Sequence, residues 1–321
     1  MTSLFWPGDA RAGDLFTDRA FLEAMVVVEA AWVGERLAVP DVELDSEAGG
    51  NPVIPLIDAL HAARPDLDLH TGLTSQDVID SALMLLLRDA VTIIRDHLDK
   101  ALVALDRLAD QHGTTSMIGR TLAQWALPIT FGDKVARWRA GLEGARADLA
   151  GLAFPCQVGG PVGTSQDGAV LAERLGLSTA DSWHTQRRPI TRAGDALVTA
   201  TDACGHLARD VLELSRPEIG ELSEARGGGS SSMSHKANPV LSVLIRRAAL
   251  TTPLLAATLH LCAAEQVDER ADGAWHAEWD TLRILVRRTV VAVSQTADLV
   301  EGLRVHPDRM AANLASAEAA P

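Results

Sequence analysis

The chain has 321 residues, of which 47% are hydrophobic and 22% charged, a composition that fits a globular protein and excludes a disordered one. This length allows one large domain or two, with enough residues for a sizeable core. Because 43 acidic residues outweigh 29 lysines and arginines, the formal net charge is -14, which argues against nucleic acid or an anionic membrane as a partner. An anionic ligand would need positive groups concentrated at its own site.

Three cysteines, Cys156, Cys204 and Cys262, lie far apart and match no metal-binding spacing. We therefore expect inert thiols in a reduced, cytoplasmic protein. The N-terminus lacks a basic segment followed by an apolar run, and the apolar stretches 82–87 and 289–293 are short. Neither a secretory signal nor a transmembrane helix is expected.

Helical patterns follow one another along the chain. A helix is predicted near 18–38 and a short one near 53–63. Five long segments then carry apolar residues at spacings of three and four: 76–111, 127–150, 189–216, 238–266 and 275–303. A stretch rich in glycine and proline, 154–161, forms a loop before a short helix, and alternating strand patterns are absent. Since helices of about 25–35 residues span about 35–50 Å, we predict an all-α fold built on an elongated five-helix bundle.

Several of these helices look apolar on more than one side, and the segment 238–266 does so most clearly. A helix that is apolar all round must be buried. Burial of this one would need a second subunit, so we expect a homo-oligomer.

Two predicted helix starts carry polar residues suited to an anion. At the first, Thr74 and Asp77 fit a capping box, and plain capping is the simplest interpretation of this stretch. At the second, Arg120 offers a fork of donors that suits a carboxylate, although a lone arginine is more often a surface or ion-pair residue. We place Pro128 in the first turn of the helix that follows.

A third start follows three glycines and three serines, at 227–232. Such a run is usually a flexible linker. Here it leads into Lys236, Asn238 and Pro239, where we expect Asn238 to be the N-cap and Pro239 the first helical residue. A helix start beside a lysine can hold a carboxylate, and the glycines would let the serines close over it.

Two further clusters combine aromatic and polar residues. One contains Trp183, His184 and Arg187, and the other contains Trp275 and His276. Tryptophans of this kind more often pack in a core or an interface than bind a ligand. The histidine and cysteine spacings predict no metal site, and no Gly-x-Ser-x-Gly elbow supports a serine hydrolase.

These motifs together resemble a known family. The segment 229–239, GSSSMSHKANP, resembles the signature loop of the fumarase/aspartase superfamily, Gly-Ser-Ser-x-Met-Pro-x-Lys-x-Asn-Pro. The segments 74–77 and 119–121 match its other two regions, in the same order. Within the superfamily, the segments 70–80, 183–187 and 275–279 are most similar to the cycloisomerases of 3-carboxy-cis,cis-muconate. The likeness runs from about Phe16 to Leu314.

The resemblance implies a small N-terminal helical domain over 1–70, a central long-helix bundle over 71–303, and a remnant of a largely absent C-terminal domain over 304–321. It implies a homotetramer whose active sites combine residues of different subunits. The implied reaction closes 3-carboxymuconate to a carboxymuconolactone by intramolecular carboxylate addition, in the protocatechuate branch of the β-ketoadipate pathway. The substrate is a small polycarboxylate, and no cofactor, metal, nucleic acid or membrane is required.

The resemblance also assigns residues to roles. Ser230 matches the catalytic base, activated by loop closure, backbone N–H groups and Lys236. His70 is expected to donate a proton or to pair with a carboxylate. The residues expected to bind substrate are Thr74, Ser75, Gln76, Arg120, Thr121, Gln124, His184, Arg187, Ser231, Lys236, Asn238 and His276.

The chain departs from the pattern in three places. Leu122 stands where many members have histidine and these cycloisomerases usually have tryptophan, Ser234 replaces a proline, and the C-terminus is short. Two alternatives follow. One is another lyase of the superfamily, such as adenylosuccinate lyase, for which only Arg11 and Arg19 are available near the N-terminus as phosphate ligands. The other is a non-catalytic structural member.

Overall fold

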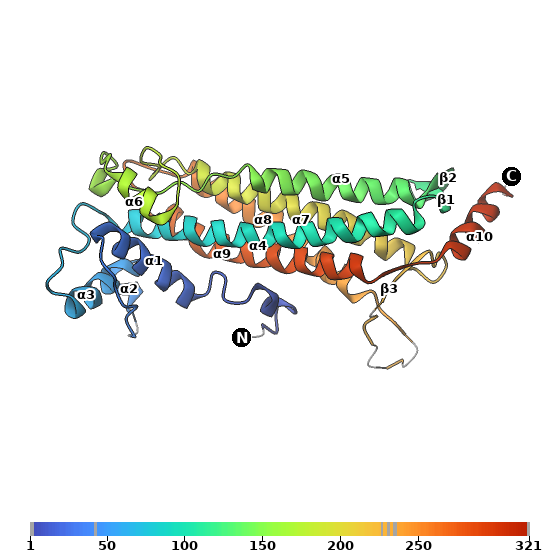
Figure 1. Cartoon of the computed structure of the whole chain (residues 1–321), viewed down its shortest axis with the longest axis horizontal. Helices are drawn as coiled ribbons and strands as arrows, with labels where there is room; N and C mark the ends of the chain where they lie inside the picture. The colour runs from blue at the N-terminus through green and yellow to red at the C-terminus, as the bar shows by residue number, and fades with distance from the viewer. Residues whose placement is uncertain (1–2, 42–43, 226, 230–231, 234–235, 320–321) are drawn as a thin grey trace.

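The computed structural model describes residues 3–41, 44–225, 227–229, 232–233 and 236–319, and shows an elongated bundle of long helices (Figure 1). The five bundle helices are α4 (Ser75–His112), α5 (Phe131–Ala150), α7 (Arg188–Leu214), α8 (Val240–Ala264) and α9 (Gly273–Glu301). The predicted all-α fold and its elongated five-helix bundle are confirmed.

Shorter helices gather at the two ends of the bundle (Figure 1). Those at the end where α4 begins are α1 (Asp18–Val33), α2 (Ser46–Gly49), α3 (Val53–Ala63) and α6 (Gly168–Leu175), together with the 3₁₀ turn η2 (Gly160–Val162). A further 3₁₀ turn, η1 (Asp9–Ala12), packs on α9, and α10 (Pro307–Glu318) packs on the opposite end. The first helix is shorter than predicted because Gly34 takes a left-handed conformation, with φ 78°, directly after Val33. The domain boundaries at 70 and 303 stay predictions.

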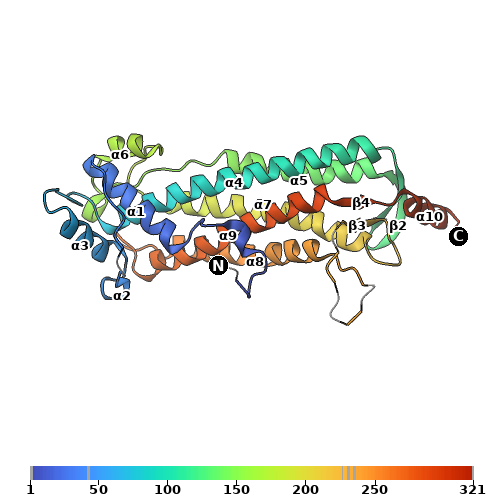
Figure 2. The same ribbon diagram turned by 60° about the horizontal axis from the view of Figure 1, so that its bottom comes forward.

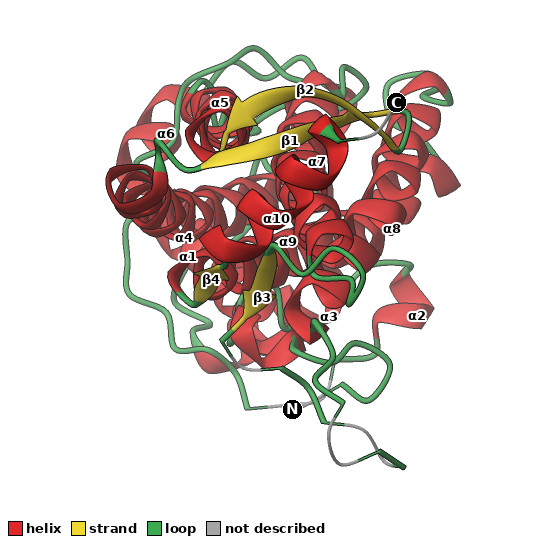
Figure 3. Ribbon diagram, turned by 90° about the vertical axis from the view of Figure 1, so that its right-hand side faces the viewer, coloured by secondary structure: helices red, strands yellow, loops and turns green. Residues whose placement is uncertain are grey.

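The structure contains strands that the sequence analysis did not predict. β1 (Ser116–Thr121) and β2 (Gln124–Thr130) form an antiparallel hairpin at one end of the bundle (Figure 3), and β3 (Leu222–Glu224) pairs with β4 (Leu303–Val305). Pro128 lies in β2 opposite Ile118, so the prediction that it opens a helix is wrong. The helix begins at Phe131, where Thr130 and Asp133 form a capping box. Proline is tolerated in β2 because a hairpin has edge strands, where a missing N–H breaks no ladder bond.

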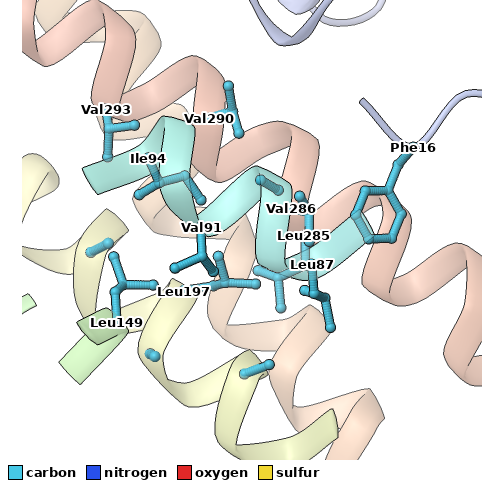
Figure 4. Packing of buried hydrophobic residues seen from close by; sticks show 14 of the residues in the cluster. Phe16, Leu87, Val91, Ile94, Leu149, Leu197, Leu285, Val286, Val290 and Val293 are labelled. Carbon is cyan, nitrogen blue, oxygen red and sulfur yellow. The ribbon is translucent and has the colours of Figure 1, made fainter. Parts of the chain in front are cut away.

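The core fills the space between the long helices (Figure 4). Val91 and Ile94 of α4 pack near Val286 and Val290 of α9, and each of these side chains is at most 3% exposed. This packing follows from the three-and-four spacing that predicted the helices, since that spacing places apolar residues along one stripe of each helix.

α8 lies along one edge of the bundle beside α7 and α9 (Figure 2). It buries Ile245 and Leu259 and leaves an apolar stripe exposed on its other side, consisting of Val243, Leu250, Leu254 and Leu261. By length and composition α8 could also cross a membrane. Its packing on two neighbours makes it a bundle helix with one face left uncovered in the single chain.

Candidate active site

The start of α4 carries the first predicted site. Thr74 and Asp77 form the expected capping box, in which the Thr74 N–H donates to Asp77 Oδ2 at 2.9 Å. Thr74 is buried, whereas Ser75 is half-buried and lies in the first turn. Plain capping therefore occurs here, and the hydroxyl of Ser75 remains nearer to solvent.

Asp77 also holds a neighbouring loop. Its Oδ1 accepts a hydrogen bond from the Gly159 N–H at 2.7 Å, and its Oδ2 accepts one from the Gly160 N–H at 3.0 Å. His184 Nε2 lies 2.8 Å from Asp77 Oδ1, and Gln76 donates to the His184 carbonyl oxygen at 2.9 Å. Gln76 and His184, two of the predicted substrate-binding residues, are therefore buried and hydrogen-bonded to other residues of this chain. Their roles in substrate binding stay predictions.

Arg187 lies at the centre of a buried charge network. Its guanidinium pairs with Asp80 at 2.7 Å and Glu278 at 2.6 Å, and all three side chains are fully buried. Burial acts to lower the pKa of Arg187, but the two carboxylates raise it overall, so the guanidinium stays charged. Burial raises the pKa of Glu278. The network joins α4, α7 and α9, and in this chain Arg187 binds protein carboxylates.

His70 and His276 lie at the same end of the bundle. His70 Nδ1 is 2.6 Å from Oε1 of Glu29, a buried residue of α1. His276 is exposed, and its Nδ1 lies 2.9 Å from the Asp272 carbonyl oxygen. Both imidazoles can reach solvent, as a ligand-binding role requires.

The second predicted site lies in the hairpin at the opposite end. Arg120 makes a bidentate pair with the buried Glu221, at 2.8 and 3.0 Å. Thr121 and Gln124 are exposed on either side of the turn residues Leu122 and Ala123. A cavity of about 610 Å³ borders the hairpin; its basic lining residues include Arg120, Lys134, Arg137 and Arg209.

The third site lies at the start of α8. Gly228 pairs with Asn238, the Asn238 amide donates to the Gly229 carbonyl oxygen at 3.2 Å, and Lys236 is exposed. Ser230 and Ser231 lie outside the described residues, so their predicted roles have no structural counterpart here.

The helix start at α8 differs from the prediction. α8 begins at Val240, with Pro239 rather than Asn238 in the N-cap position. The buried carboxylate of Glu224 accepts the N–H groups of Leu241, at 3.1 Å, and Ser242, at 2.8 Å. The predicted cap at Asn238 is wrong because a residue distant in sequence supplies the acceptor instead.

The candidates fall into two separate sets within one chain (Figure 1). At the end where α4 begins lie His70, Thr74, Ser75, Gln76, His184, Arg187 and His276. Towards the other end lie Arg120, Thr121, Gln124, Lys236 and Asn238. The 38 residues of α4 make a helix of about 57 Å between them. One chain does not bring the three predicted regions together.

Sequence reasoning missed the carboxylates that hold the candidates, namely Glu29, Asp80, Glu221 and Glu278, and it missed Glu224, which caps α8. One signal was available, because Glu29 follows Met25 and Val28 on the buried side of α1, where an acidic residue is unusual. Among the described residues, no group of histidine, cysteine and acidic side chains could hold a metal ion.

Comparisons with known proteins point to one group. A protein-family model described as a lyase matches residues 41–252. The nitrosuccinate lyase of Streptomyces davaonensis is 41% identical over 91% of this chain and 67% of that protein. The 3-carboxy-cis,cis-muconate cycloisomerase of Bradyrhizobium diazoefficiens is 40% identical over 90% of this chain and 70% of that protein. The crystal structure of the 3-carboxy-cis,cis-muconate lactonizing enzyme of Pseudomonas putida matches with a TM-score of 0.86 and 31% identity, over 94% of this chain and 77% of the other.

Proposed function

Because this chain belongs to the lyase family of the fumarase/aspartase superfamily, we propose that it is a lactonising cycloisomerase that acts on 3-carboxy-cis,cis-muconate. The single observation that carries the proposal is the similarity to proteins of that name, at 33–40% identity over most of the chain. The fold agrees with this, because the long helices match the lactonizing enzyme of Pseudomonas putida.

The reaction moves electrons within one substrate molecule. A carboxylate oxygen forms a C–O bond to the far carbon of a conjugated double bond, and the π electrons move onto the neighbouring carboxylate. The resulting aci-carboxylate then takes a proton at its α carbon. The negative charge that builds up on this intermediate is the main contribution to the activation free energy, so preorganised hydrogen-bond donors should surround it. The first turn of α4, with Ser75, and the exposed Lys236 are donors of this kind.

Ser230 is the residue that we propose as the proton-transferring group. A serine has little acid or base strength at its ordinary pKa, so it needs desolvation and nearby positive charge. Lys236 lies six positions further along the same loop. His184, Arg187 and the other buried candidates would shape the pocket through the carboxylates that they bind.

We also propose that the active protein is a cytoplasmic homotetramer whose subunits share their sites. Two observations support the sharing of sites between subunits. The three candidate regions lie towards opposite ends of one chain, and the α8 stripe leaves Leu250 64% exposed and Leu254 72% exposed. Antiparallel pairing of bundles along this stripe would cover it and bring the start of α4 in one subunit to the hairpin of another.

A second candidate function is elimination from a substituted succinate. The observation that favours it is the 41% identity to a nitrosuccinate lyase. Both candidates need a stabilised carbanion next to a carboxylate, so the same donors would serve. The two reactions differ in the length of the substrate. They also differ in the reacting group, which is a carboxylate that adds in the first reaction and a substituent that leaves in the second.

An absorbance assay separates these candidates. The purified protein is mixed with 3-carboxymuconate, and in parallel with nitrosuccinate, and loss of the diene or appearance of fumarate is followed. We expect loss of the diene, and a fall of about 10² or more in kcat for Ser230→Ala. Production of fumarate with no loss of diene would favour the second candidate. Consumption of neither substrate would contradict both functions and favour a non-catalytic superfamily member.

A further inference from the structure

Glu29 is an acidic residue in a core position. It lies in α1 with 0% exposure, among Met25, Val26 and Val28, which are also buried. Burying a carboxylate is costly unless a partner compensates for the lost water. Oε1 lies 2.6 Å from His70 Nδ1, whereas Oε2 has no hydrogen-bond partner in the part of the chain that the structure describes. The His70 imidazole is therefore the compensating group.

His70 itself is held in an unusual backbone conformation. Its φ is 61°, in the left-handed region that non-glycine residues rarely adopt. The His70 carbonyl accepts the Leu73 N–H at 3.2 Å, which fixes the turn directly before the Thr74 cap. Such strain persists only where the surroundings fix it, and it often marks a functional position.

The two ring nitrogens of His70 have different environments. Nδ1 faces Glu29, so in the neutral ring the proton belongs on Nδ1, because the carboxylate can only accept. Nε2 has no partner among the described residues and is not one of the buried unpartnered atoms. With the side chain 22% exposed, Nε2 is the atom open to solvent beside the start of α4.

We propose that Glu29 is a positioning residue for the reaction. It fixes the ring of His70 through Nδ1 and stabilises the protonated imidazole, whose Nε2–H then donates a charged hydrogen bond to a substrate carboxylate. No proton is transferred in this role. The charge on that carboxylate grows as the aci-carboxylate forms, so the hydrogen bond strengthens in the transition state. The inference rests on the proposed function for the substrate that reaches Nε2.

The other charged groups around this pair have partners of their own. In α4, Asp77 pairs with His184 and Asp80 with Arg187. In α6, Arg174 donates to the carbonyl oxygens of Ala31 and Trp32. Asp68, in the preceding turn, accepts from the Thr71 hydroxyl. Within the described residues, Glu29 is thus the carboxylate that acts on His70.

The kinetic test uses Glu29→Gln, which keeps the size and an acceptor oxygen but removes the charge. The ring then loses the carboxylate that holds Nδ1–H, so its hydrogen bond to the transition state should weaken. We expect kcat to fall by about tenfold while KM changes by less than about twofold. Glu23→Gln, which changes an exposed carboxylate of the same helix, should leave kcat and KM unchanged.

A purely structural role predicts a different result. Glu29→Gln would then lower Tm without changing the kcat of the folded protein, and this would overturn the proposal. In a His70→Gln background, Glu29→Gln should have no further effect on kcat, because the pair acts as one unit. An additional loss of more than about threefold there would also contradict it.

The closing experiment needs no substrate. Ring nitrogens of ¹⁵N-histidine protein are observed by NMR, with His70→Gln to assign the signal. We expect the proton of neutral His70 on Nδ1, and we expect the Nε2–H tautomer to gain population in Glu29→Gln, because an amide can donate as well as accept. A proton on Nε2 in the parent protein, or the same tautomer balance in both proteins, would overturn the inference. If neither carboxylate substrate is turned over, the proposed function fails on its own, and the NMR result still decides whether Glu29 controls this ring.

Discussion

The two ends of the bundle differ in how far one chain completes them. Where α4 begins, Arg187 forms ion pairs with Asp80 and Glu278. The Asp77 carboxylate caps α4, accepts a backbone hydrogen bond from the glycine loop and contacts His184. At the other end, the hairpin tip leaves Leu122 99% exposed. The exposed apolar stripe of α8 is a second surface that the single chain leaves uncovered. One chain completes the buried charge network at the first end, whereas the hairpin and the stripe have the features of surfaces that a second subunit covers.

Arg187→Met would break the buried charge network and should give the largest effect. Removing the guanidinium leaves two buried carboxylates without their cation, which should cost about 3–5 kcal/mol of unfolding free energy in urea. Burial raises the pKa of Glu278, and removal of the neighbouring cation should raise that pKa further. The variant should therefore be most stable at low pH, and its unfolding free energy should fall as pH rises through the raised pKa.

Arg188→Met is the matched control, since Arg188 is the exposed next residue and the first residue of α7. It should change the unfolding free energy by less than about 0.5 kcal/mol. Equal effects of the two variants would mean that the buried network does not stabilise this end.

Leu254→Arg tests the uncovered α8 stripe. A charge in the middle of an apolar interface should dissociate the oligomer, because the arginine would be buried without a partner. Size-exclusion chromatography with light scattering should show a smaller species than the parent. Val170→Arg, at an exposed position of the short helix α6, should leave the mass unchanged. An unchanged mass for Leu254→Arg would contradict the proposal that a second subunit covers the stripe.

The hairpin turn offers a smaller test. Leu122 and Ala123 have φ values of 49° and 65°, a conformation that glycine adopts at much lower cost. Ala123→Gly should raise the unfolding free energy by about 1 kcal/mol. Ala126→Gly in the neighbouring strand β2 should lower it by about 0.5–1 kcal/mol. The same sign for both variants would rule out strain in the turn.

The smallest effect concerns the thiols of the interior. Burial raises the pKa of Cys156 to about 11 and that of Cys204 to about 12. Both should remain protonated at pH 8 and resist iodoacetamide, because the thiolate is the reactive form. Mass spectrometry should show alkylation only after denaturation. Rapid alkylation of the native protein would show that the interior opens readily.

The two regions also differ in how well sequence predicts them. The long helices were predicted to within a few residues because their apolar spacing repeats over many turns, and α3 was predicted at its observed bounds. The hairpin was missed because its turn, Leu122 and Ala123, lacks the glycine or asparagine that usually signals one. Pro128 was assigned to the wrong element because proline is accepted both in the first turn of a helix and in an edge strand, and the residue alone does not distinguish the two.

The candidate site was harder to predict for a different reason. Thr74 and Asp77 were identified correctly as a capping box, since both partners lie within one turn. Glu224 caps α8 and Glu221 holds Arg120 from distant segments, and pairing at that range cannot be derived from spacing. Several expected substrate-binding groups thus have carboxylates of the chain itself as partners.

We propose above that one active site combines the start of α4 from one subunit with the loop before α8 from another. Mixing two variants of low activity, His70→Gln and Lys236→Met, tests it most directly. After the subunits are exchanged under mild denaturation, the mixture should regain 3-carboxymuconate turnover, because some sites then carry both native residues. Native mass spectrometry confirms that mixed oligomers form. Mixed oligomers that are no more active than the separate variants would contradict the claim.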